Sequence, residues 1–148
     1  MGGNIVADIY HQFPINAPLR QVFEAISTPD GLDSWWTLRA AGIPSEGEEY
    51  EFWFGSEADW RAVVSVYVPE ESLEFTMTEA QQDWMGTRVG FGIDEKDGVT
   101  NVRFYHTGWP RANEHFQESS YCWAMYLRLL KRYVERGEVV PYSERPEA

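Results

Sequence analysis

The stretch Asn113–Gly137, NEHFQESSYCWAMYLRLLKRYVERG, is the most informative segment of this 148-residue chain. It contains no proline, and its only glycine is the last residue, where glycine typically ends a helix in the left-handed conformation. We therefore predict one helix that ends at Arg136 and is about 36 Å long. The residues of its predicted apolar side recur at alternating steps of four and three. They are Phe116, Ser120, Trp123, Leu127, Leu130 and Val134, flanked by Ser119, Cys122, Tyr126, Leu129 and Tyr133. A helix that is apolar over so wide an arc is expected to have a curved surface wrapped around it.

The sequence before this helix alternates between apolar and polar residues, and this period of two indicates β-strands. The alternating segments are residues 8–15, 49–54, 60–68, 73–77, 89–93 and 102–106. Short turns such as Gly55–Ser56–Glu57 and Lys96–Asp97–Gly98 connect them, so an antiparallel meander is predicted. Within 60–68 the run Ala62–Val63–Val64 leaves the inward side ambiguous and indicates a β-bulge.

Two short helices are predicted between the first two strands. The first has Asn16 as its expected cap and an apolar face made of Leu19, Val22, Phe23 and Ile26. A second short turn is expected at Leu32 to Trp36. This order of elements is typical of an α+β domain with its helices on one face of an antiparallel sheet. We expect a single domain over residues 1–148, with a core of about residues 8–137 and a mobile polar tail at 138–148.

The charge of the chain is strongly negative, with 24 Asp and Glu against 12 Lys and Arg, a net charge of −12. Such a surface repels phosphate backbones and anionic lipids, so binding to nucleic acid or to a membrane surface is not expected. No apolar run approaches the roughly 18 residues that cross a bilayer, and Met1–Asn4 lacks the start of a signal peptide. The single Cys122 excludes an internal disulfide and a cysteine-based zinc site. We therefore expect a cytoplasmic protein.

Several short motifs occur in an order that resembles a known family. They are Phe13–Pro14–Ile15–Asn16–Ala17–Pro18, Val22–Phe23, Trp35–Trp36, Val66–Tyr67–Val68–Pro69, Leu73–Glu74–Phe75, His106–Thr107–Gly108–Trp109, and Tyr121–Cys122–Trp123 with Leu127, Leu130 and Lys131. Together, over residues 8–137, they resemble the START-like (SRPBCC) superfamily. Within it, they are most similar to the subfamily named after activator homologues of the heat-shock-protein-90 ATPase.

This resemblance implies a helix-grip (Bet v 1-like) fold. In that fold a curved antiparallel sheet wraps around the long C-terminal helix and leaves an apolar cavity between them. Members of the superfamily bind lipids, sterols, polyketides or plant hormones, and some act as cyclases or as oxygenase subunits. Fold follows from such a resemblance more directly than function does.

The content of aromatic residues supports such a cavity. Seven Trp, eight Tyr and eight Phe make up 16% of the chain, and ligand pockets are typically lined by such rings. A crowded aromatic core is the alternative interpretation. The predicted ligand-binding residues are Trp36, Phe52, Phe54, Trp60, Phe75, Trp84, Phe91, Phe104, His106, Ser120, Trp123 and Leu127.

His106 is the one candidate for catalysis. It shares the inward side of its strand with Val102 and Phe104, so it could contact a ligand or act as a general base. The alternative is a core histidine that is hydrogen-bonded to the backbone or to a hydroxyl group such as that of Ser120. His11 also lies on an apolar side and is interpreted as structural, whereas His115 near the start of the long helix is expected to be exposed.

For the other candidate functional residues, we predict structural roles. Cys122 is expected to pack, inert, on the flank of the long helix. Gly90–Phe91–Gly92 is expected to mark a bend in a strand. No metal-ligand spacing or cofactor-binding motif occurs, so neither a metal nor a cofactor is predicted. We expect the charged residues Glu49, Glu51, Arg88 and Arg103 to lie at the surface.

Three functions remain open at this point. The preferred one is the binding of a small hydrophobic molecule, lipid-like, aromatic or polyketide-like, in the cavity. The second is an enzyme of cyclase or hydrolase type that uses His106. The third is a co-chaperone, with a role in the stress response, that stimulates a chaperone ATPase through its acidic surface; the subfamily name is its main support. A homodimer formed through exposed aromatic residues is also left open.

Overall fold

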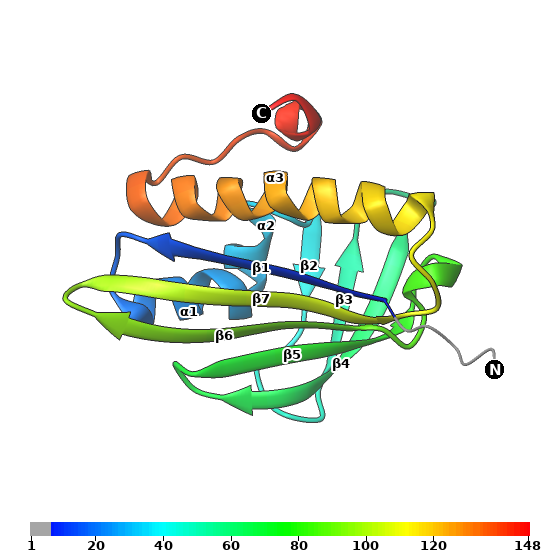
Figure 1. Cartoon of the computed structure of the whole chain (residues 1–148), viewed down its shortest axis with the longest axis horizontal. Helices are drawn as coiled ribbons and strands as arrows, with labels where there is room; N and C mark the ends of the chain where they lie inside the picture. Colours follow the sequence, from blue (N-terminus) through cyan, green and yellow to red (C-terminus); the bar gives the residue numbers. More distant parts are fainter. Residues whose placement is uncertain (1–6) are drawn as a thin grey trace.

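Seven strands form one curved antiparallel sheet, and a long helix lies along one face of it, in the computed structural model, which describes residues 7–148 (Figure 1). Met1–Asn4, on which the expectation about a signal peptide rests, lie outside the described residues. The elements in chain order are β1 (Ala7–Ile15), α1 (Leu19–Ser27), α2 (Pro29–Asp33), β2 (Arg39–Ala41), β3 (Glu49–Trp53), β4 (Asp59–Val68), β5 (Ser72–Glu79), η1 (Gln82–Trp84), β6 (Arg88–Lys96), β7 (Val99–Trp109), α3 (Glu114–Arg136) and η2 (Tyr142–Glu147).

The strand order β1-β7-β6-β5-β4-β3-β2 places the first strand beside the last and leaves β1 and β2 as the two edges. Every neighbouring pair is antiparallel, which confirms the predicted meander and the α+β, helix-grip architecture. The register of β4 against β5 shifts at Arg61/Ala62 and at Val64/Val66, which confirms the bulge predicted for this strand. Between β6 and β7, Asp97 and Gly98 both adopt a positive φ, as a tight two-residue hairpin requires.

Helix α3 has the ends that its sequence indicates. The Asn113 side chain accepts a hydrogen bond from the Phe116 N–H at 2.9 Å, and Gly137 closes the helix with φ of 67°. The buried face carries Trp123, Leu127 and Leu130 as predicted, together with Ser119 and Leu129. The apolar side of the helix is therefore its buried side, and the helix lies along the sheet (Figure 1).

The expected cap of α1 was wrong. The helix begins at Leu19, and its cap residue is Pro18, which has no side-chain hydrogen bond to offer. Asn16 instead donates its backbone N–H to Glu135 Oε2 of α3 at 2.6 Å. Asn16, two residues before Pro18, thus links the end of β1 to α3 and does not cap α1.

The polar tail packs against the rest of the domain, contrary to the prediction that it is mobile. Residues 138–148 turn back over α3 and end in η2 (Figure 1). Arg145, which is only 3% exposed, donates to three backbone carbonyls: Asp33 O at 2.7 Å, Thr37 O at 3.2 Å and Val140 O at 3.0 Å. A buried guanidinium with this many acceptors fixes the segment on the α2–β2 connection.

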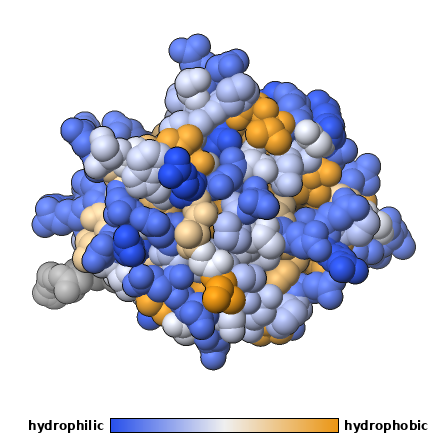
Figure 2. Space-filling view, turned by 180° about the vertical axis from the view of Figure 1, so that it is seen from behind, coloured by the Kyte–Doolittle hydropathy of each residue, from blue (hydrophilic) through white to orange (hydrophobic). Residues whose placement is uncertain are grey.

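The surface fits the acidic composition. On the face shown in Figure 2, hydrophilic side chains predominate and apolar ones lie in separate small spots. Among residues 7–148, no helix is both long enough and apolar enough to traverse a lipid bilayer.

Candidate functional site

The predicted ligand-binding rings come together in one network, here called the aromatic cluster. Trp123 of α3 is its centre, with ring centroids 4.6 Å from Phe104, 5.1 Å from Trp36 and 5.9 Å from Trp84. Ring contacts connect all ten members: Trp36, Phe52, Phe54, Trp60, Phe75, Trp84, Phe91, Phe104, His106 and Trp123. Leu127 is buried one turn along α3 from Trp123.

These rings fill the space that they were expected to enclose. The centroids of neighbouring rings lie 4.5–6.0 Å apart at tilted, stacked or edge-to-face angles, which are the separations of rings in direct contact. Three hollows stand out on the described part of the chain, and all of them lie at its surface. The crowded-core interpretation therefore describes the arrangement of the rings in this structure.

His106 is held by two hydrogen bonds inside the aromatic cluster. Its Nδ1 accepts from the Trp123 indole N–H at 3.1 Å, which requires Nδ1 to carry no proton. The neutral ring then has its proton on Nε2, which donates to Thr87 Oγ1 at 2.8 Å. The Thr87 hydroxyl in turn donates a hydrogen bond to the carbonyl oxygen of Trp84 at 2.6 Å. Both ring nitrogens are thus satisfied, and the tautomer is fixed.

The surroundings of His106 make it a poor base. The side chain is fully buried, and desolvation, helped by the nearby His115, lowers its pKa from 6.5 to about 3. With both nitrogens occupied, no lone pair is left for a substrate proton. The interpretation of His106 as a core histidine therefore fits the geometry, although the hydroxyl partner is Thr87 and not Ser120.

Two other indole groups near His106 lack an acceptor. Trp84 and Trp109, with ring centroids 4.5 Å and 5.0 Å from His106, have buried N–H groups with no hydrogen-bond partner among the described residues. An unpaired buried donor costs about 1–3 kcal/mol, so such groups are uncommon in a core. Both N–H groups therefore remain available as hydrogen-bond donors.

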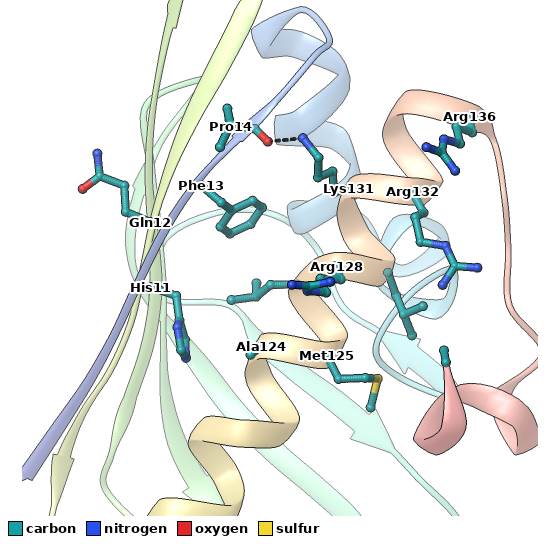
Figure 3. Close-up of a pocket in the computed structure, with 13 residues that line it drawn as sticks. His11, Gln12, Phe13, Pro14, Ala124, Met125, Arg128, Lys131, Arg132 and Arg136 are labelled. Carbon is teal, nitrogen blue, oxygen red and sulfur yellow. Dashed lines mark hydrogen bonds between the residues drawn. The ribbon is translucent and has the colours of Figure 1, made fainter.

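The hollow between the sheet and α3 lies at the β1 edge, and we call it the β1–α3 groove (Figure 3). It has a volume of about 660 Å³, within the range of small-molecule sites. Its lining residues are His11, Gln12, Phe13 and Pro14 of β1, Ala124, Met125, Leu127, Arg128, Leu129, Lys131, Arg132 and Arg136 of α3, and Ala148. Of the residues predicted to bind a ligand, only Leu127 lines it.

The β1–α3 groove adjoins the aromatic cluster through His11. The His11 ring stacks on Phe104, with centroids 6.2 Å apart, and Phe104 packs on Trp123. On the helix side, His11 Nε2 lies 3.4 Å from Ser120 Oγ, a long contact that bridges sheet and helix. Ser120, a predicted ligand-binding residue, therefore contacts His11, which lines the groove.

The expectations for Cys122 and His115 need correction. Cys122 is exposed, because it lies just outside the arc of α3 that faces the sheet. His115 is half-buried and its Nδ1 contacts Asp83 Oδ2 at 3.0 Å.

Gly90 lies within β6 under the Tyr105 ring, so the glycine there makes room for a close ring. Among residues 7–148, no group of three His, Cys, Asp or Glu side chains is placed to hold a metal ion.

The remaining surface predictions are confirmed. Glu49 and Glu51 lie on the outer side of β3, where both contact Arg61 at 3.5 Å and 3.2 Å. Arg88 and Arg103 are exposed, and Arg103 pairs with Asp94. These charges belong to the solvated sheet surface and not to an acid–base pair.

Residues 16–135 match the family model for AHSA1, described as activator of Hsp90 ATPase homolog 1-like protein. The match spans most of the chain. This protein belongs to the AHSA1 family. Among curated proteins, none matches the chain.

Solved structures agree with this AHSA1 assignment. The Aha1 dimer from Colwellia psychrerythraea is 27% identical, covers 89% of this chain and 98% of that one, and superposes with a TM-score of 0.80. A Staphylococcus saprophyticus protein is 18% identical over 90% of this chain and 96% of its own, with a TM-score of 0.77. A Mesorhizobium loti protein is 17% identical over 89% and 99%, with a TM-score of 0.78. The last two show the fold alone.

The groove of this AHSA1 domain was missed in the sequence because its two walls lie more than 100 residues apart, at residues 11–14 and 124–136. The sequence did carry one signal. Arg128, Arg132 and Arg136 recur every four residues, so they share a helix face in an otherwise acidic chain. Charge spacing on α3, and not aromatic content, points to this site.

Proposed function

We propose that this protein binds a small, largely apolar molecule between its sheet and α3, at the β1–α3 groove. The observation that carries the proposal is the hollow itself, about 660 Å³, with Phe13, Met125 and Leu127 among its walls. A site of this size and lining is typical of small-molecule binding. Membership of the AHSA1 family, in the START-like superfamily, supports the same function.

The aromatic cluster would form the inner wall of this site. A molecule that separates His11 from Ser120 breaks only a 3.4 Å contact and then meets Phe104 and Trp123. The unpaired N–H groups belong to Trp84, which stacks on Trp123, and to Trp109, whose ring lies beside His106, and each could donate to a carbonyl or hydroxyl oxygen. Burying about 300 Å² of apolar ligand surface is worth about 7 kcal/mol before the costs of association.

Filling the groove is expected to abolish binding. In Ala124→Trp, the indole would occupy the space beside Phe13, since Ala124 lies on the side of α3 that faces β1 (Figure 3). We expect the heat of binding of decan-1-ol, measured by isothermal titration calorimetry, to disappear in this variant.

Gln117→Trp is the matched control, because Gln117 is an exposed residue of the same helix outside the groove. It should bind decan-1-ol as the unmodified protein does. Equal binding by both variants would show that the alcohol goes elsewhere, and no binding by the unmodified protein would refute the proposed function.

The family match favours a second candidate function. The AHSA1 model is described by activation of the Hsp90 ATPase, and the Colwellia protein is named Aha1. A contact through the acidic segment 46–97 would then raise the ATPase rate of an Hsp90-type chaperone, and high salt would weaken the effect. An unchanged hydrolysis rate with the protein in excess would exclude this function. The enzymatic alternative has no such support, because both nitrogens of His106 are engaged.

A further inference from the structure

The β1–α3 groove concentrates positive charge in an acidic protein. Four of the twelve Lys and Arg residues line it, although the chain carries a net charge of −12. Within residues 7–148, no Asp or Glu side chain is part of the lining. The four cations are Arg128, Lys131, Arg132 and Arg136.

The spacing of the arginines is unfavourable for an isolated helix. Arg128, Arg132 and Arg136 follow one another at steps of four, so the three residues lie on one face of α3. Like charges at this spacing destabilise a helix. The helix dipole favours cations in the last turn, which accounts for Arg136 but not for Arg128, two turns earlier. A bound anion would remove the repulsion.

Two of the four cations already have partners. Lys131 Nζ donates to Pro14 O at 2.6 Å and to Glu135 Oε2 at 2.8 Å, and Arg132 pairs with Glu138. In the described part of the chain, neither Arg128 nor Arg136 has a carboxylate within 4.0 Å. Arg136 acts on Glu135 and Glu138 only from a distance, where it helps to lower the pKa of each carboxyl group.

The free charge of Arg128 lies next to the apolar wall. Figure 3 shows Arg128 in the middle of the lining residues, with Phe13 on the strand side and Met125 on the helix. Apolar surface and an unpaired guanidinium are thus offered to one ligand at the same place. This pairing fits a molecule that has an apolar body and one anionic end.

We propose that the ligand of the β1–α3 groove is an amphiphilic carboxylate, whose apolar body packs against Phe13 and Met125 while Arg128 binds the carboxylate. The inference rests on the binding function proposed above and specifies its ligand. A guanidinium can donate two parallel N–H bonds to a carboxylate, and charge-assisted bonds of this kind are the strong ones. Arg136, which has no carboxylate partner among the described residues and lies two turns further along α3, adds attraction for the anion without being required to touch it.

Decanoate and decan-1-ol test the inference, since the two differ in their charged end and share the apolar chain. By titration calorimetry in low salt, we expect decanoate to bind at least tenfold more tightly than decan-1-ol. Arg128→Gln should remove this difference by weakening decanoate binding about tenfold and leaving the alcohol unchanged. Arg88→Gln, which removes an exposed charge outside the groove, is the matched control and should bind both as before. Raising the salt concentration should weaken decanoate binding alone.

The outcomes separate the two proposals. If decan-1-ol binds and decanoate binds no more tightly, the inference is wrong while the binding function stands. If decanoate binds more tightly but Arg128→Gln keeps the full difference, the anion is held elsewhere and the inference is again wrong. If decan-1-ol does not bind, or if Ala124→Trp binds it normally, the proposed function fails and the inference fails with it.

Discussion

Between pH 8 and pH 4, His106 alone is expected to remove about 3 kcal/mol from the free energy of unfolding. Burial lowers the pKa of its folded-state imidazole from 6.5 to about 3. As the pH falls below 6.5, His106 therefore becomes protonated in the unfolded chain, whereas in the folded protein it becomes protonated only near pH 3. The unfolded state binds more protons throughout this window, so stability falls as the pH falls, by about 5 kcal/mol in all.

Urea unfolding at a series of pH values, compared with His106→Gln, measures this contribution. A glutamine amide can still accept from Trp123 and donate to Thr87, but it does not titrate. Carboxyl groups with a lowered pKa, such as those of Asp83 and Asp94, also reduce stability in acid, but they do so equally in both proteins. The unmodified protein should lose stability more steeply than His106→Gln between pH 6.5 and pH 3. Parallel curves would show that His106 is not held neutral.

Trp123→Ala is expected to have the largest effect of any single truncation, a loss of about 3–5 kcal/mol. The indole is 2% exposed, packs on Trp36, Trp84 and Phe104, and donates to His106. Its removal would leave a large void at the centre of the aromatic cluster and a buried nitrogen without a donor. Urea unfolding at neutral pH measures the loss.

Two further variants separate the causes. Trp123→Phe keeps most of the ring packing but leaves Nδ1 of His106 without a donor, for which we expect a loss of about 1–3 kcal/mol. Tyr121→Ala, at an 80% exposed position of the same helix, should change stability by less than about 0.5 kcal/mol. A loss below about 1 kcal/mol in Trp123→Ala would mean that the rings are not closely packed, and that a hollow exists among them after all.

Local periodicity made most of the fold predictable. Strand alternation depends only on neighbouring residues, and the helix stripe and Gly137 cap depend on residues one turn apart, so both could be deduced from the chain. The cap of α1 could not, because Asn16 is drawn to Glu135, a partner 119 residues away. The docking of Arg145 likewise depends on where the carbonyls of Asp33 and Thr37 come to lie.

The site was less predictable than the fold. Strand parity placed His106 inside correctly, but its partners come from the loop before β6 and from α3, and no pattern in β7 indicates Thr87 or Trp123. The excess of rings was expected to line a cavity, with a crowded core as the alternative, and the rings pack on one another. Composition does not tell whether rings surround a space or fill it, because that depends on their relative orientation.

One contact at the groove has a consequence for the sheet as a whole. β1 is an edge strand, and exposed edges invite strands of other molecules to add to them. Pro14 has no N–H to offer, and its carbonyl oxygen already accepts from Lys131. At the opposite edge, β2 has only three residues. The protein thus protects both margins of its sheet against intermolecular β-pairing, and with it against amyloid-like aggregation.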